Sequence, residues 1–228
     1  MQIAKKGKNF DLMELLGKNV KQDERTFHKQ LVNIHEFYLS GEIESAENYI
    51  QWFDTIRHAG ETDVIKMYIN SPGGDVFTAI QFMRALQETS AGVVMSVEGL
   101  CASAATMILL CGETFEISEH CMFMFHNYSS GTFGKGGEMY DQLQHERKWS
   151  EKLLREIYKD FLTESEITSL LDNKDIWMDG EEVIKRLEAR QAKLEAEQEA
   201  KEQAEEEAEK KPTTTKKKVT IKKKEPDA

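Results

Sequence analysis

Hydrophobic residues follow regular spacings between about residues 31 and 188 and become sparse beyond that range. Within it, short runs rich in β-branched and aromatic residues alternate with segments whose apolar residues recur every three to four positions. The first pattern predicts strands over residues 33–39, 64–69, 92–97, 114–117 and 122–126. The second predicts helices over residues 45–58, 76–86, 103–111, 138–162 and 164–171, and from about residue 182.

This alternation of predicted strands and helices is typical of an α/β fold with a mainly parallel sheet. Because parallel strands are usually joined by helices that pack on the sheet, we expect both faces of the sheet to be covered. A glycine-rich loop over residues 129–137 precedes the long predicted helix. Thr163 begins the next helix, with Glu166 at the spacing of a capping box.

The two ends of the chain differ from its middle. Residues 1–30 are polar and are expected to form an extension, whereas residues 31–188 are expected to form the folded domain. Residues 189–211 are rich in Glu, Lys, Ala and Gln without an apolar seam, which predicts a charged, solvated helix. Residues 212–228 are rich in Lys and Thr and are predicted to be disordered. This tail either only solvates the protein or docks on a partner.

Composition and charge narrow the function classes. The net charge of −11 argues against general nucleic-acid binding by the domain, since such binding needs a basic face. Cys101, Cys111 and Cys121 lie in apolar segments without CxxC pairing, which favours reduced thiols and a cytoplasmic location. The longest apolar run, residues 102–111, is too short to span a bilayer, so no membrane association is expected. No metal-ligand spacing is evident, and neither a metal nor another cofactor is expected.

Three short segments carry candidate chemistry. Residues 71–74, Ser-Pro-Gly-Gly, follow a buried strand, and the amides of Gly73 and Ala104 are candidates for holding an oxyanion. Ser103 begins a helix of small residues, where its hydroxyl is either a nucleophile or only an N-cap. His126 ends a strand and is either a general base or a satisfied core histidine. Together these residues favour the acyl-transfer site of a serine hydrolase.

The order of these motifs resembles that of the proteolytic subunits of the Clp protease family (ClpP). The resemblance rests on residues 69–74 (INSPGG), on Gly99-x-x-Ala102-Ser103 and on residues 124–126 (MFH). It extends over residues 34–184 and implies a ClpP/crotonase-type fold of repeated β-β-α units, with residues 138–162 as a handle helix between two rings. Asn127 and Tyr128 stand where the family usually has Gln-Pro, which indicates a divergent member such as a phage-encoded one.

The resemblance also implies a catalytic triad of Ser103, His126 and an aspartate. Asp175 stands just before an Ile-Trp pair and matches the family's acid, while Asp172 is the competing candidate. In the family, the substrate peptide lies as an added β-strand between two segments of the chain. The corresponding residues here are Gly74, Asp75 and Val76 on one side and Ser130, Gly131, Thr132 and Phe133 on the other.

The expected function is therefore that of an ATP-dependent Clp-type serine endopeptidase, which hydrolyses unfolded proteins inside an oligomeric chamber. The expected partners are peptide or unfolded-protein substrates, further copies of the chain in a ring, and an AAA+ unfoldase ATPase. Three alternatives stay open. They are a phage head-maturation protease of the same fold, a crotonase-fold enzyme that acts on acyl-CoA thioesters, and a ring subunit without catalytic activity.

Overall fold

The computed structural model describes residues 2–3 and 32–210, with side chains described for residues 32–201. The chain separates into two compact units, Met1–Ala192 and Lys193–Ala228. Most of the predicted N-terminal extension and all of the predicted disordered tail over residues 212–228 lie outside the described residues. The boundaries that the sequence predicts for these end segments therefore stay predictions.

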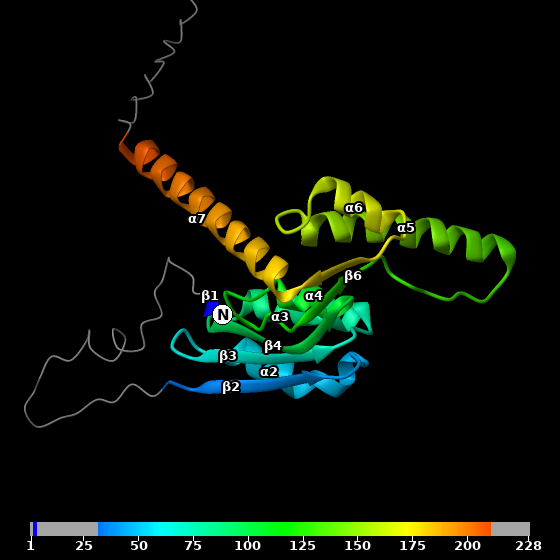
Figure 1. The fold of residues 1–228 in the computed structure, drawn as a ribbon, viewed down its shortest axis with the longest axis horizontal. Helices are drawn as coiled ribbons and strands as arrows, with labels where there is room; N and C mark the ends of the chain where they lie inside the picture. The colour runs from blue at the N-terminus through cyan, green and yellow to red at the C-terminus, as the bar shows by residue number, and fades with distance from the viewer. Residues whose placement is uncertain (1, 4–31, 211–228) are drawn as a thin grey trace, which may run out of the picture. The chain divides into compact units, whose positions relative to one another are not determined.

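A seven-stranded sheet forms the centre of the first unit (Figure 1). Its main path has the order β1-β5-β4-β3-β2, and β6 pairs with both β4 and β7. The pairs β2–β3, β3–β4, β4–β5 and β4–β6 are parallel, as predicted, whereas β1–β5 and β6–β7 are antiparallel. The strands are β1 (Gln2–Ile3), β2 (Ile34–Ser40), β3 (Val64–Ser71), β4 (Gly92–Ala102), β5 (Thr114–Ile117), β6 (Met122–Phe125) and β7 (Ile176–Asp179).

The helices follow the predicted segments closely, and α7 is the longest of the described ones. They are η1 (Ala46–Tyr49), α2 (Ile50–His58), α3 (Val76–Glu88), α4 (Ala104–Leu109), α5 (Gly136–Tyr158), α6 (Glu164–Leu171) and α7 (Gly180–Lys210). The α/β class and the long helix expected from the family resemblance are thus confirmed, the long helix being α5.

The core lies between the sheet and the helices that pack against it. In β3, Ile65, Met67 and Ile69 are fully buried, and their alternation with more exposed residues follows from the two-residue period of a strand. Phe53 of α2 and Phe82 of α3 pack edge to face, with their ring centroids 4.7 Å apart. These contacts fix α2 and α3 on the inner face of the strands.

Within residues 32–210, the prediction that both faces of the sheet are covered is wrong at β2 and β3. Tyr38 of β2 is 60% exposed and stacks on Tyr68 of β3, with their ring centroids 4.6 Å apart. Lys66 lies 5.0 Å from the Tyr68 ring and forms a 2.9 Å ion pair with Glu116 of β5. On the outer face of these strands, the described residues form polar and aromatic contacts, and no described helix covers them.

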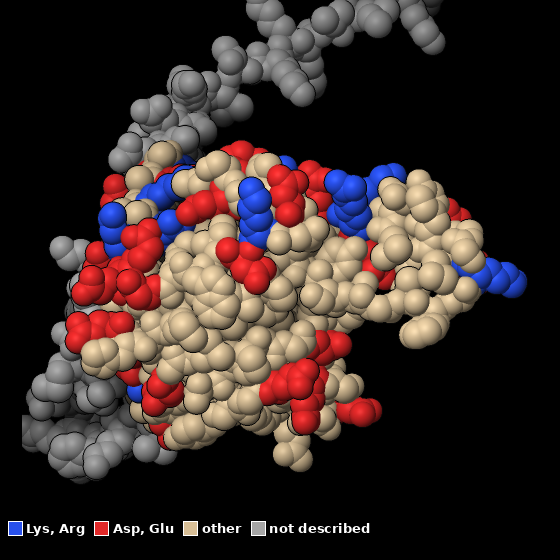
Figure 2. Space-filling model, turned by 45° about the vertical axis from the view of Figure 1, so that its right-hand side comes forward, with Lys and Arg blue, Asp and Glu red and all other residues tan. Residues whose placement is uncertain are grey.

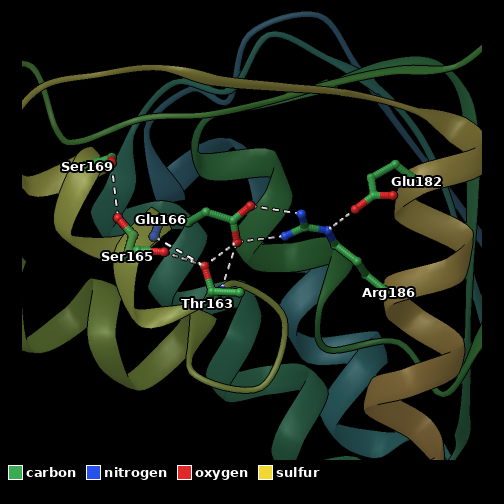
Figure 3. Close-up of polar contacts among 6 residues, drawn as sticks. All are labelled: Thr163, Ser165, Glu166, Ser169, Glu182 and Arg186. Atoms are coloured by element: carbon green, nitrogen blue, oxygen red, sulfur yellow. Dashed lines mark hydrogen bonds and ion pairs between the residues drawn. The ribbon is translucent and has the colours of Figure 1, made fainter.

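A polar cluster joins α6 to the beginning of α7 (Figure 3). Arg186 of α7 donates two 2.8 Å hydrogen bonds to Glu166 of α6 and one of 2.6 Å to Glu182. Thr163 and Glu166 form the predicted capping box at the start of α6. The hydrogen bonds from Arg186 lower the pKa of Glu166 to about 2, so this carboxylate stays charged well into the acidic range.

Charged side chains are unevenly distributed on the face drawn in Figure 2. Basic side chains gather along its upper edge beside acidic ones, while the clusters lower on this face are mainly acidic, and an uncharged area lies between them (Figure 2). In the part of the chain that the structure describes, no helix is both long enough and apolar enough to cross a membrane.

Candidate active site

Ser103 lies at a sharp turn between β4 and α4. Its φ of 55° is in the left-handed region, which is sterically unfavourable for a residue other than glycine. The side chain makes no capping hydrogen bond to α4, so the interpretation of Ser103 as an ordinary N-cap is wrong. Backbone strain of this kind is often retained where it exposes a functional side chain.

The imidazole of His126 lies directly beside the hydroxyl of Ser103. The Ser103 Oγ atom lies 2.5 Å from His126 Nε2, and His126 follows directly on the last residue of β6. The parallel pairing of Ala102 with Met124 brings the ends of β4 and β6 together. The Ser103 amide donates a 2.8 Å hydrogen bond to the Met124 carbonyl, which fixes the turn against β6. A serine hydroxyl within hydrogen-bonding distance of an imidazole nitrogen is the arrangement of a nucleophile and its general base.

The strand register brings the backbone of Asp175 opposite that of His126. In the antiparallel pair β6–β7, Phe125 is the partner of Ile176, so the next opposed residues are His126 and Asp175. Directly opposed residues on antiparallel strands have their Cβ atoms about 4.5–5.5 Å apart. Asp172 lies three residues further from this point, which favours Asp175.

Neither aspartate is hydrogen-bonded to His126 in this structure. The side chains of Asp172 and Asp175 are exposed, and neither forms a hydrogen bond or ion pair with another described side chain. The structure thus brings together the serine and the histidine but leaves the acid detached from them. The role of Asp175 therefore stays a prediction.

The predicted oxyanion donors differ in their availability. The Gly73 amide donates a 3.1 Å hydrogen bond to Ser71 Oγ, whereas the amides of Gly74 and Ala104 have no acceptor among the described residues. Gly74 and Ala104 also line the cavity beside Ser103, and Gly73 does not. Gly74 is therefore better suited than Gly73 to act with Ala104.

Gly73 has a different role, which is to allow close packing against the nucleophile. Its φ is +92°, and a Cβ atom there would lie 2.6 Å from Ser103 Cβ and 2.9 Å from the Ala104 nitrogen. Real Cβ atoms do not approach other heavy atoms so closely. Only glycine at this position lets residues 71–74 lie directly against the serine turn.

A cavity of about 520 Å³ opens beside Ser103 and His126. Its apolar lining includes Met107, Leu153 and a stacked pair formed by Phe77 and Trp149, whose ring centroids lie 5.5 Å apart. This volume suits a ligand of a few residues. The two aromatic residues were not predicted as site residues, because their spacing also fits ordinary helix packing.

The residues expected to bind a substrate strand divide into two groups. Gly74, Asp75 and Val76 line the cavity, and the Asp75 side chain also accepts a 2.6 Å hydrogen bond from the Thr78 amide at the start of α3. The segment Ser129–Gly134 is an irregular loop and not a strand, and Ser130 Oγ donates to Glu146 of α5.

Further along this segment, Thr132 Oγ1 donates to Gln142 of α5. Gly131 and Phe133 are exposed, and neither lines the cavity, whereas Ser130 does. The loop is therefore tied to α5 by two side-chain hydrogen bonds, and its pairing with a substrate stays a prediction.

Two polar residues that hold the serine turn in place, Thr106 and Tyr158, were not predicted from the sequence. Thr106 donates a 2.7 Å hydrogen bond to the Ser103 carbonyl, and its hydroxyl lies 2.7 Å from that of Tyr158 on α5. Both residues are buried, and burial raises the pKa of Tyr158 far above its usual value. These contacts fasten the serine turn to α5, which no sequence spacing indicates because the residues are 52 positions apart.

Two further kinds of reactive group are the thiols of Cys101 and Cys111 and clusters of metal-binding side chains. Burial raises the pKa of the Cys111 thiol to about 12 and that of the Cys101 thiol further, so both are protonated near neutral pH. No cluster of three or more His, Cys, Asp or Glu suited to a metal ion occurs within the described ranges.

Comparison with known proteins identifies the family of this chain. The family model for Clp protease matches residues 20–186. One relative is the ATP-dependent Clp protease proteolytic subunit 2 of Treponema denticola. It is 25% identical over 172 residues, which cover 74% of this chain and 86% of that protein. Subunit 1 of Salinibacter ruber is 28% identical over 127 residues, 54% of either chain. The subunit of Bacteroides thetaiotaomicron is 27% identical over 120 residues, 52% of this chain and 54% of that one. Because the family model matches most of its length, this chain belongs to the Clp protease family.

Proposed function

We propose that this protein is a serine endopeptidase in which Ser103 is the nucleophile, His126 the general base and Asp175 the acid. The observation that carries the proposal is the 2.5 Å approach of Ser103 Oγ to His126 Nε2 at a strained turn. Membership of the Clp protease family supports the same chemistry.

In the proposed reaction, Ser103 Oγ attacks the carbonyl carbon of a peptide bond while His126 Nε2 takes the hydroxyl proton. The amides of Gly74 and Ala104 donate to the oxyanion that develops. His126 then gives the proton to the departing amine, and an acyl-enzyme ester remains on Ser103. Water, deprotonated by His126, hydrolyses this ester, and the proton returns to Ser103. Asp175 accepts from His126 Nδ1 and stabilises the imidazolium form.

Substitution of the serine tests this proposal. S103A is expected to fold and to lose cleavage of fluorogenic peptides, since it removes the hydroxyl that lies 2.5 Å from His126 Nε2. Residual peptidase activity in S103A equal to that of the unmodified protein would reject the assignment. H126A is expected to lose activity as well, because the serine hydroxyl is then no longer activated.

For the substrate, we propose an extended peptide that lies along Gly74–Val76 and the loop that includes Ser130. Support comes from the cavity lining, to which these residues contribute, and from the free Gly74 amide. Pairing with main-chain groups reads the peptide backbone, so we expect broad sequence selectivity. The loop must then leave its contacts with α5 or lengthen them when a peptide binds.

We further propose that the protein forms rings, acts with an AAA+ unfoldase in an ATP-dependent manner, and is cytoplasmic. The printed names of the relatives describe proteolytic subunits of ATP-dependent Clp proteases. The free thiols of all three cysteines fit a reducing compartment. Light scattering should give the mass of an oligomer, and an unfolded protein should be degraded faster with unfoldase and ATP. A monomer with full activity would reject the ring.

A head-maturation protease would use the same catalytic residues but would depend on the charged tail for its delivery. Truncation after residue 188 distinguishes the two, because only a tail-dependent protease should lose its substrate choice. Unaltered substrate choice after truncation would reject the head-maturation alternative.

A further inference from the structure

The side chain of Asn127 joins three elements next to the candidate base. Its Oδ1 atom accepts hydrogen bonds from Ser150 Oγ of α5 at 3.1 Å and from the Tyr128 amide at 2.9 Å. Its Nδ2 atom donates to Asn173 Oδ1 at 3.3 Å. Asn173 lies in the loop between α6 and β7, two residues before Asp175. One amide thus connects the residue after His126, the long helix and the acid-bearing loop.

The position of this amide pair follows from the strand register. Regular pairing between β6 and β7 ends at Phe125 and Ile176, one step before His126 and Asp175. The Asn127–Asn173 hydrogen bond lies just beyond that step. It therefore holds the two segments together at the point where backbone pairing stops.

Both ends of the bridge are themselves held in place. Ser150 is only 2% exposed, so its hydroxyl offers Asn127 a fixed anchor on α5. Asn173 has a φ of 59°, and its amide donates to the Leu170 carbonyl at 2.9 Å, which closes the end of α6. Asparagine tolerates this left-handed conformation better than most residues. The bridge thus links a buried hydroxyl on α5 to a residue whose backbone is hydrogen-bonded at the end of α6.

We propose that Asn127 is a positioning residue that sets the distance between His126 and the loop carrying Asp175. The inference rests on the proposed function and deepens it, because it assigns the control of the acid to the side-chain amide of Asn127, a residue that also lines the cavity. In this structure the Asp175 carboxylate is detached from His126, so it must turn towards Nδ1 to act as the acid. The bridge keeps the backbone of its loop beside β6; without it, the end of β7 separates from β6 and the carboxylate cannot make that contact.

The first test separates kcat from KM. N127A is expected to lower kcat for a fluorogenic peptide by about 100-fold, the loss typical of a misplacement of about 1 Å, and to change KM less than about twofold. N48A is the matched control, because Asn48 Nδ2 donates a similar 2.7 Å hydrogen bond to Glu44 outside the cavity. A normal kcat in N127A overturns the inference.

The second test separates positioning from a general loss of structure. N173G keeps the left-handed backbone but removes the amide, so it should reproduce the loss seen in N127A. N173D keeps the Oδ1 acceptor for Asn127 and should restore most of the kcat lost in N173G. Equal activity of N173G and N173D overturns the inference, because the amide pair then has no catalytic effect.

The third test asks whether Asn127 acts through Asp175. The rate at which a fluorophosphonate labels Ser103 is measured in D175A and in N127A/D175A. The two rates should agree within about twofold, since Asn127 has no acid left to position. A further loss in the double variant equal to that in N127A alone overturns the inference. A D175A variant with a normal rate instead contradicts the proposed triad, whereas an active S103A contradicts the proposed nucleophile.

Discussion

The packing of Gly73 against the nucleophile gives a prediction whose size can be worked out from the structure. A Cβ atom at Gly73 would lie 2.6 Å from Ser103 Cβ and 2.7 Å from the Ala102 carbonyl oxygen. Both neighbours belong to the serine turn and cannot rotate away. G73A must therefore displace residues 71–74 or Ser103 itself.

Gly41 provides a matched control for the cost in unfolding free energy of placing alanine at a positive φ. Its φ of +88° is close to the +92° of Gly73, but a Cβ atom there would meet nothing within 4 Å. Alanine at such a φ costs about 1–2 kcal/mol, which is what we expect for G41A. Overpacking adds about 1–3 kcal/mol, so G73A should lower the free energy of unfolding by about 2–5 kcal/mol.

Two assays separate the cost of alanine at a positive φ, which both variants share, from the displacement of Ser103, which only G73A should cause. Urea denaturation gives the free energy of unfolding of each variant, and fluorophosphonate labelling gives the reactivity of Ser103. G73A should label about 100-fold more slowly than G41A, because a shift of about 1 Å misaligns the hydroxyl. Equal destabilisation of the two variants, together with equal labelling rates, would refute the packing argument.

Two further predictions concern the ion pair between α6 and α7 and a hydrogen bond beside the cavity. Because Arg186 lowers the pKa of Glu166 to about 2, the pair stabilises the fold above the ordinary pKa of a glutamate, about 4.5, and this contribution is lost as the pH falls towards 2. R186M should therefore be less stable at pH 7 and lose less stability on acidification, as measured by urea midpoints; parallel curves for the two proteins would contradict this. Y158F removes the hydrogen bond to Thr106 and should cost about 1 kcal/mol of unfolding free energy, and an unchanged value would show that this bond contributes nothing.

Local rules predicted much of the fold from the sequence. The capping box at Thr163 was predicted from two residues three positions apart and is present in the structure. The strand β7 was missed, because Ile176–Asp179 has only four residues and no clear alternation. It forms through its antiparallel pairing with β6, which is a long-range contact. The N-terminal pair Gln2–Ile3 was missed for the same reason, since only its pairing with β5 makes it a strand.

The candidate site was predictable in its residue types but not in its finer geometry. Ser103 and His126 were predicted, and their contact follows from the pairing of β4 with β6. The choice between Gly73 and Gly74 could not be made from adjacent identical residues, because it depends on which amide Ser71 occupies. The link from Asn127 likewise depends on where the loop after α6 lies.

The central claim is that the hydroxyl of Ser103 is the reactive group and that His126 activates it. The most direct measurement is to label the protein with a fluorophosphonate, digest it and identify the modified residue by mass spectrometry. The account predicts a single phosphonylated residue, Ser103, and a labelling rate that falls at least about 100-fold in H126A. A label on any other residue, or an unchanged rate in H126A, would contradict it.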